Sequence, residues 1–223
     1  MNHLIVQRFI LGLRDYRLYR EGILSFYHVY SAFERTWAYL LANPNLVEPH
    51  IYAALQALSD PRLTRAPAIA LDLTYLYGSD QFDPAAPADP NSVRGEYVAH
   101  IERTLREKPH LLLAYAHNYY MALFAGGKML LRQILMTKAF FPIKSPASDS
   151  DEAKAFSTNM FVFPMDTGKE EQLRTKFKAA MELVEESLNE EEKTGLFTYP
   201  VASTFVADQL AQKSSRSPGS FTK

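Results

Sequence analysis

Hydrophobic residues recur every three or four positions along most of this chain, which is the spacing expected of amphipathic helices. The clearest stripe predicts a helix that ends before Pro44, and its apolar positions are Ile23, Tyr27, Tyr30, Phe33, Trp37 and Leu41. A second stripe follows a capping box formed by Thr167 and Glu170, and it comprises Leu173, Phe177, Met181, Val184 and Leu188. No strand-like alternation of any length competes with these stripes, so the pattern predicts an all-α protein.

Proline, glycine and capping residues divide the rest of the chain into shorter predicted helices. Their expected starts and ends are Leu4, His50, Leu58, Pro67, Gly78, Ser92, Leu105 and Pro109. Residues 81–91 contain three prolines and predict a surface loop, after which Ser92 can cap the next helix. The acidic residues from Glu185 to Glu192 predict a solvated helix end. We therefore expect about seven helices, packed by ridges into grooves in a single domain.

A pair of adjacent glycines, Gly126 and Gly127, interrupts a long apolar helical pattern that runs from Pro109 to Phe140. Each glycine inside a helix costs roughly 1 kcal/mol relative to alanine, so the pair needs a physical reason. One interpretation is a kink that brings the helix backbone close to a large flat ligand. The alternative is that the glycines only allow two helices to pack closely.

Composition narrows the classes of protein and site that remain. With 223 residues, of which 47% are hydrophobic, the chain can bury a full core as one domain. A net charge of −1 provides no basic surface for nucleic acid, and the absence of cysteine excludes disulfides, cysteine nucleophiles and cysteine ligands to metals. No apolar run reaches the ~18 residues of a membrane span, and the N-terminus does not resemble a signal peptide.

Four segments of the chain carry motifs in a fixed order, at residues 25–34, 71–78, 117–128 and 161–164. Residues 117–128 resemble the distal helix of heme oxygenases, whose pattern reads H-x-Y-x-R-Y-L-G-D-L-S-G-G. The other three segments resemble S-L-Y-H-x-Y-x-A-L-E, D-L-x-x-W-Y-G and F-x-F-P of the same family. The resemblance covers roughly Leu4 to Lys193, which predicts a domain at residues 1–193 and a divergent C-terminal segment with a disordered tail at 194–223.

The resemblance implies a single-domain, multi-helical heme oxygenase-like fold with a kinked distal helix, as in a eukaryotic, fungal-type member. It implies heme as substrate and cofactor, O2, electrons from an NADPH-dependent reductase, and biliverdin, CO and iron as products. Such a protein is expected to be cytoplasmic, or at the surface of the endoplasmic reticulum if a C-terminal anchor is missing from this version. Two other classes stay open, namely a non-catalytic heme-binding or regulatory relative and a helical interaction protein that has lost heme.

The resemblance also implies site residues, and this chain departs from the family at several of them. Aligned without gaps, the family's axial histidine falls before Met1, and His3 lies about six residues too late, on another side of the helix. A solvent-facing role for His3 is the simpler interpretation, and the metal ligand stays unassigned. The family's distal aspartate aligns with Leu123, its distal arginine with Tyr119, and the tyrosine partner of that arginine with Tyr30. The alternative for Tyr30 and Tyr119 is that they are ordinary core aromatics.

Three more residues are candidates for contact with heme. His117 aligns with a family tyrosine at the heme edge, where it could act as an accessory proton donor or a ligand, although a satisfied, partly buried histidine is favoured. Arg174 and Lys178 match the two basic residues that hold heme propionates, and arginine suits bidentate carboxylate recognition. The alternative for this pair is a solvated helix face with Glu170 and Glu182 as partners.

Overall fold

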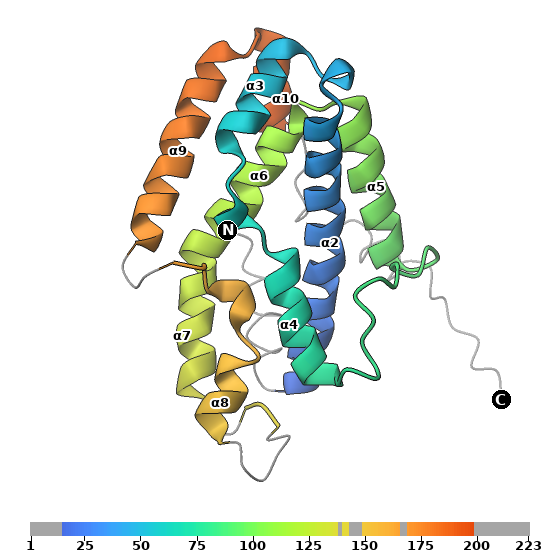
Figure 1. Cartoon of the computed structure of the whole chain (residues 1–223), viewed down its shortest axis with the longest axis vertical. Helices are drawn as coiled ribbons and strands as arrows, with labels where there is room; N and C mark the ends of the chain where they lie inside the picture. The colour runs from blue at the N-terminus through green and yellow to red at the C-terminus, as the bar shows by residue number, and fades with distance from the viewer. Residues whose placement is uncertain (1–14, 138–139, 143–148, 166–168, 199–223) are drawn as a thin grey trace, which may run out of the picture.

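The computed structural model describes residues 15–137, 140–142, 149–165 and 169–198, with side chains as far as residue 194. The regular elements in these ranges are all helical, and no strand occurs among them. In chain order (Figure 1) they are α2 (Tyr16–Ala42), η1 (Pro44–Leu46), α3 (Pro49–Leu58), η2 (Pro61–Leu63), α4 (Ala66–Tyr77), α5 (Val93–Glu107), α6 (Leu111–Ala122), η3 (Leu123–Gly127), α7 (Lys128–Met136), α8 (Ser150–Ala155), η4 (Asn159–Phe161), α9 (Glu170–Ser187) and α10 (Glu190–Thr198). The prediction of an all-α fold is confirmed, with nine α-helices among the described residues where about seven were expected.

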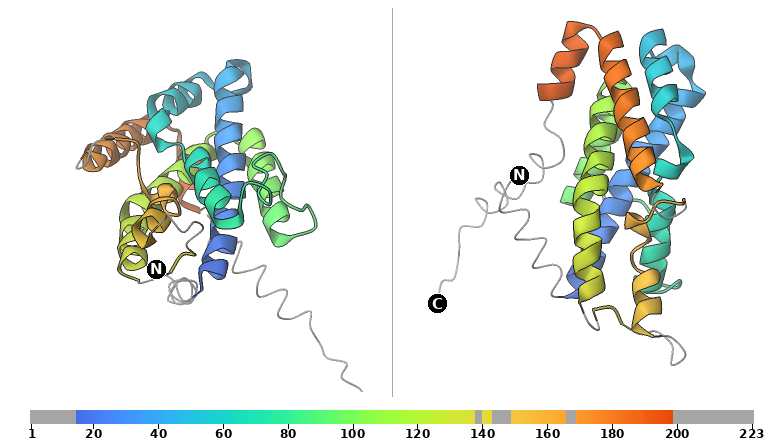
Figure 2. Two further views of the ribbon diagram at one scale, coloured as in Figure 1. Left: turned by 60° about the horizontal axis from the view of Figure 1, so that its bottom comes forward. Right: turned by 90° about the vertical axis from the view of Figure 1, so that its left-hand side faces the viewer.

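Helix α2 is the central element of the fold. Asp15 caps its N-terminus by accepting a hydrogen bond of 2.8 Å from the backbone N–H of Arg17. The buried residues of α2 follow the predicted stripe, and they are Tyr19, Ile23, Tyr27, Tyr30, Ala32, Phe33, Thr36, Trp37 and Leu40. Figures 1 and 2 show α2 beside α4 and α5, against which it packs most extensively. Buried residues from α2 to α9 belong to one continuous hydrophobic core.

Several of the predicted helix boundaries agree with the structure. Helix α4 ends before Gly78, whose φ of 102° lies in the region that favours glycine. Helix α5 follows Ser92, whose hydroxyl accepts a hydrogen bond of 3.0 Å from the backbone N–H of Gly95. Residues 81–91 form a loop without helix or strand, as predicted. Pro109 lies in the turn before α6 and not in the first turn of that helix.

Some sequence predictions fall partly or wholly outside the described residues. Helix α9 begins after Lys169, which makes no side-chain cap hydrogen bond. Thr167 of the predicted capping box lies outside the described ranges, as do the predicted first helix at Leu4 and the predicted tail at 199–223. Because α10 continues across residue 193, the division of the chain at that position stays a prediction.

The acidic run that leads into α10 is only partly solvated, so the prediction for it is wrong at Glu192. This residue is 9% exposed. Its carboxylate accepts a hydrogen bond of 2.9 Å from the backbone N–H of Asn189, whose side-chain oxygen accepts one of 2.9 Å from the N–H of Glu192. The same carboxylate lies 3.0 Å from Nε2 of His50, so it joins α10 to α3. The reciprocal cap with Asn189 and the contact with the His50 ring compensate the burial of this carboxylate.

The long apolar pattern from Pro109 to Phe140 is divided at the glycine pair, as predicted. Helix α6 continues directly into η3, a π-helical segment that ends with Gly126 and Gly127, and α7 follows without a break. A π-helical turn contains more residues than an α-helical turn, and such segments often occur at functional sites. Among the glycines that the structure describes, Gly78 is the one with a positive φ, so backbone conformation requires neither glycine of the pair.

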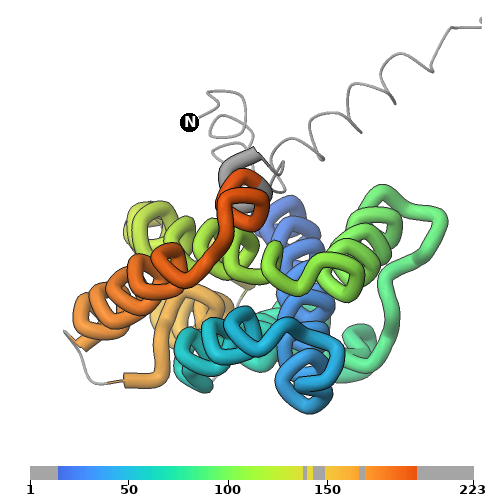
Figure 3. Tube along the Cα trace, turned by 90° about the horizontal axis from the view of Figure 1, so that it is seen from above, coloured from blue at the N-terminus to red at the C-terminus, as the bar shows by residue number. Residues whose placement is uncertain are grey.

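Helices α9 and α10 both pack against α6, which is the first part of the long element formed by α6, η3 and α7. Helix α9 packs against α3 and α6, and α10 packs against α6, which Figure 3 shows from above. Across the described ranges, no helix combines the length and the apolar character that membrane crossing requires.

Candidate functional site

The two glycines of η3 have different surroundings. A Cβ atom added at Gly126, which is partly exposed, would meet nothing within 4 Å. A Cβ atom added at Gly127, which is buried, would lie 3.3 Å from Cδ1 of Phe161 and 3.4 Å from Cδ2 of Leu123. Both interpretations of the pair therefore have physical support. Figure 1 shows that the long element changes direction between α6 and α7, and we call this position, at η3, the bend. Gly127 permits close packing there, and Gly126 leaves the backbone open.

The surface around Gly126 is apolar and made of small or flexible side chains. Ala122 and Ala125 are exposed, and Met129 is 57% exposed on the first turn of α7. Alanine adds only a methyl group, and methionine adapts its shape to irregular or flat ligands. The bend therefore presents backbone, methyl groups and a thioether to a ligand that approaches from outside.

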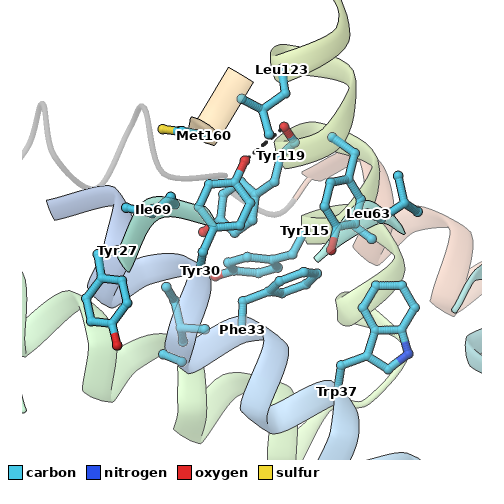
Figure 4. Close-up of a cluster of buried hydrophobic side chains, with 14 of the residues drawn as sticks. Tyr27, Tyr30, Phe33, Trp37, Leu63, Ile69, Tyr115, Tyr119, Leu123 and Met160 are labelled. Carbon is cyan, nitrogen blue, oxygen red and sulfur yellow. Dashed lines mark hydrogen bonds between the residues drawn. The ribbon is translucent and has the colours of Figure 1, made fainter. Parts of the chain in front are cut away.

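Tyr30 and Tyr119 lie together beneath this bend, and Figure 4 shows their contact. The hydroxyl of Tyr30 donates a hydrogen bond of 3.2 Å to the backbone carbonyl of Tyr119, and the two ring centroids are 5.5 Å apart. The hydroxyl of Tyr119 lies 3.0 Å from that of Tyr97 on α5. Burial raises the pKa of both Tyr30 and Tyr119 well above the ordinary value for tyrosine. Both phenols therefore keep their protons at neutral pH and serve as packed, hydrogen-bonded core residues, which fits the alternative interpretation.

Leu123 stands at the start of η3, one turn after Tyr119, and it is 7% exposed (Figure 4). Its side chain covers the position where a Cβ of Gly127 would lie. Residues 111–127, which form α6 and η3, contain no aspartate or glutamate. The bend therefore carries an apolar side chain where the family resemblance places a carboxylate, and α6 and η3 supply no acid that could order water there.

His117 does not join this group of residues. Its side chain is exposed on α6, so the favoured interpretation of a partly buried histidine is wrong. His3 and the segment that would precede it in the axial-ligand argument lie outside the described residues. Among the residues that the structure describes, no cluster of three or more histidine, aspartate or glutamate side chains could hold a metal ion.

Arg174 and Lys178 lie one turn apart on α9 with side chains that are 40% and 64% exposed. Arg174 Nη1 is 3.3 Å from Oε1 of Glu171, and Lys178 Nζ is 4.0 Å from Oε1 of Glu182. Such exposed ion pairs contribute little, about 0–1 kcal/mol, so both cations could exchange these partners for the carboxylates of a ligand. Glu170, the expected partner of Arg174, instead lies 2.9 Å from Lys128 Nζ and links α9 to the start of α7.

Sequence reasoning gave no role to three charged residues, Glu34, Arg65 and Asp72, that lie where α2, α4 and residues 159–162 meet. Glu34 accepts backbone hydrogen bonds from Arg65 (2.6 Å) and Ala66 (3.1 Å), so a residue of α2 caps the N-terminus of α4. Arg65 is 1% exposed and Asp72 is fully buried. Burial raises the pKa of Glu34 and that of Asp72 to about 7, against the opposing effect of their backbone hydrogen bonds. A charged residue within the apolar run 68–73 was the signal that could have identified Asp72.

Comparison with known proteins gives matches over most of the chain. A family model described as heme oxygenase matches residues 2–195. The heme-binding protein HMX1 of Saccharomyces cerevisiae is 28% identical over 178 residues, which cover 75% of this chain and 55% of that protein. A heme oxygenase of Guillardia theta is 30% identical over 125 residues, which cover 56% of this chain and 48% of that protein. The chain thus spans about half the length of the curated relatives it matches.

Solved structures extend this comparison to the fold. The crystal structure of heme oxygenase 2 from Chlamydomonas reinhardtii without heme aligns with a TM-score of 0.68 over 98% of this chain and 92% of that chain. The sequence identity in this alignment is 20%, so the likeness concerns the fold alone.

Proposed function

The chain belongs to the heme oxygenase family, and we propose that it binds heme against the exposed side of η3 and oxidises it to biliverdin, CO and iron. The reaction would use O2 and electrons from an NADPH-dependent reductase. One observation carries this proposal, namely the π-helical bend at which Gly126 leaves the helix backbone open within an apolar surface. A flat macrocycle needs such a surface because any side chain at this position would separate the ring from the helix.

The residues around the bend fit a heme group in size and polarity. Ala122, Ala125 and Met129 offer apolar contact to a porphyrin face, and the helix backbone at Gly126 is open to close approach. Arg174 and Lys178 would hold the propionates by charge-assisted hydrogen bonds, since their present partners on α9 are weakly bound.

Heme, when bound, supplies the chemistry with O2, while the protein supplies binding, orientation and electrostatics. Tyr30 and Tyr119 join α2 to α6 below the bend and so hold the apolar wall in place. Their protons are retained because burial raises both pKa values. Leu123 excludes water from the wall of the bend, so proton delivery would have to come from groups other than the side chains of α6 and η3.

Leu123 also favours a second function, which is heme binding without turnover. Leu123 occupies the position of the family's distal aspartate, and residues 111–127 contain no other carboxylate. One curated relative is itself named a heme-binding protein. Binding and turnover therefore have to be measured separately.

A heme titration of the full chain, followed by a turnover assay with NADPH and a reductase, separates the two functions. A Soret band with biliverdin formation supports heme oxygenase activity, and a band without product supports the binding function. Absence of a band in the wild-type chain would contradict both.

Two matched variants, one beside the bend and one away from it, test whether heme binds at the bend. Ala125→Leu next to the bend should weaken heme binding, because the larger side chain stands between the ring and the helix. Ala38→Leu makes the same change at an exposed position of α2 away from the bend, and it should bind heme as the wild type does. Equal affinities in the two variants would place the ligand elsewhere.

A further inference from the structure

The π-helical segment rests on a short stretch of chain at residues 159–163, which includes η4. A Cβ at Gly127 would lie 3.3 Å from Cδ1 of Phe161, so the backbone of the bend packs directly on this ring. The ring of Phe163 stacks on that of Phe124 in η3, with centroids 4.7 Å apart and an interplanar angle of 18°. Figure 1 shows the 159–163 segment between α4 and α7. The position of the bend therefore depends on the position of this segment.

Two buried charged residues of α4 and its N-cap hold the 159–163 segment at opposite ends. At its start, the carboxylate of Asp72 accepts hydrogen bonds from the backbone N–H of Asn159 (2.7 Å), the side-chain amide of Asn159 (2.8 Å) and the backbone N–H of Met160 (2.8 Å). At its end, Nη1 of Arg65 donates a hydrogen bond of 2.7 Å to the carbonyl of Val162. The guanidinium carbon of Arg65 also lies 4.3 Å from the centroid of the Phe163 ring.

Asp72 and Arg65 bear charged groups at buried positions, where a purely structural contact is usually made by apolar side chains. Buried charges carry a large desolvation penalty, and apolar residues of similar volume often stabilise a fold as well or better. What a carboxylate and a guanidinium add is direction, because both are planar groups with fixed hydrogen-bonding geometry. Arg65 uses all three nitrogens of its guanidinium, the other two donating to the carbonyls of Leu63 (3.1 Å) and Arg62 (2.8 Å).

The bend itself needs such external support. A π-helical turn is rare because its backbone packs less well than an α-helical turn, so surrounding contacts must maintain it. Within η3, Phe124 stacks on Phe163 and Gly127 packs against Phe161, so both residues reach the 159–163 segment. A shift of Phe163 would release Phe124 and allow η3 to change its helical register, which would rotate Gly126 away from its present direction.

We propose that Arg65 and Asp72 are positioning residues for the ligand site, which act through the 159–163 segment to hold η3 in its π-helical form with Gly126 facing outward. Neither residue touches the ligand in this arrangement. The inference rests on the proposed heme site for its functional consequence, but its structural part, the coupling of α4 to η3, can be tested without heme.

The experiment compares Arg65→Met, Asp72→Asn and Phe163→Leu with a destabilised control in the full chain. Ile101→Ala serves as the control because it removes a fully buried side chain of α5, a helix that packs mainly against α2. Hydrogen exchange of the heme-free proteins, measured by mass spectrometry on peptides that cover 123–128, reports the order of the bend. Heme affinity is then measured under conditions in which every variant is folded.

All three test variants should accelerate exchange at 123–128 and weaken heme binding by about tenfold or more. Ile101→Ala should lose stability but retain wild-type exchange at 123–128 and wild-type affinity. Wild-type exchange at the bend in the test variants, or equal acceleration in the control, overturns the proposal. If Arg65→Met or Asp72→Asn does not fold, Phe163→Leu decides, because it removes the ring between Arg65 and Phe124 without leaving an unpaired charge.

The two failures can be told apart. If the wild-type chain binds no heme, the proposed function fails while the exchange data still decide whether α4 holds the bend. If heme binds but exchange at 123–128 does not respond to the variants, the positioning role fails and the proposed function stands.

Discussion

Replacing the glycines of η3 one at a time by alanine should change the stability of the protein by different amounts. Both substitutions remove a glycine from a helix interior, which favours folding by about 1 kcal/mol. At Gly126 nothing opposes this gain, because the added methyl group would meet no atom within 4 Å apart from its chain neighbours and the backbone of its own helix. We therefore expect Gly126→Ala to raise the free energy of unfolding by about 1 kcal/mol.

At Gly127 the added methyl group meets two side chains that have little room to move. Cδ1 of Phe161 would lie 3.3 Å away and Cδ2 of Leu123 3.4 Å away, and both side chains are buried. Overpacking of this kind typically costs about 1–3 kcal/mol, which offsets or exceeds the gain in helix propensity. Gly127→Ala should therefore be less stable than Gly126→Ala by about 1–3 kcal/mol, since the propensity term is common to both.

Urea unfolding followed by far-ultraviolet circular dichroism measures this difference, and a heme titration of the same samples measures its functional counterpart. Gly126→Ala should weaken heme binding although it stabilises the fold, because the methyl group stands between the ring and the helix. Equal unfolding free energies for the two variants would show that the packing at Gly127 is not tight. Unchanged heme affinity in Gly126→Ala would show that the ligand does not approach this backbone.

Three further changes test other parts of the site. Arg174→Ala combined with Lys178→Ala should weaken heme affinity about tenfold or more without loss of stability, while Lys176→Ala on the same helix leaves affinity unchanged; equal affinity in all three proteins assigns the pair to a solvated face. Leu123→Asp should lower the free energy of unfolding by about 2–4 kcal/mol in a urea titration, because the residue is 7% exposed. The same variant should form more biliverdin per bound heme, and an unchanged yield would deny the position a role in proton supply. Burial raises the pKa of Asp72 to about 7, so the stability it contributes is present below about pH 4 and lost as the pH rises through 7. Urea unfolding at several pH values should show a decline from acid to neutral pH that Asp72→Asn reduces, and equal slopes in both proteins would contradict this assignment.

Much of the fold could be predicted from the sequence because the position of a helix depends mainly on residues that are close together in the chain. The stripe that begins at Ile23 matches the buried face of α2, and Ser92 and Gly78 mark boundaries that the structure retains. The first turn of α6 was misplaced, since proline suits the turn before a helix as well as the first helical position. The sequence predicts a solvated helix end at Glu192 because its partner His50 lies 142 residues away in the chain.

The candidate site could be predicted only in part, because it depends on contacts between residues that are far apart in the chain. The glycine pair indicated where the long helix changes, but its π-helical form depends on contacts with Phe161 and Phe163, which no local pattern reveals. The apolar run around Asp72 indicates a buried charge, but the residues that Asp72 binds are 87 and 88 positions away, so its partners cannot be read from the sequence around it. His117 was expected to be partly buried and is exposed, because the phase of an apolar helix does not fix which of its sides the rest of the chain covers.

At the proposed site, heme binding and heme degradation place different requirements on the bend. In our proposal, binding depends on the open backbone at Gly126 and the exposed apolar side chains beside it, and it needs no acid. Turnover needs protons as well, and Leu123 together with the two protonated tyrosines supplies none from this wall. Because the two requirements depend on different side chains, heme affinity and biliverdin yield should respond independently to substitution. A variant series in which both always change together would mean that the bend acts on the chemistry through its geometry alone.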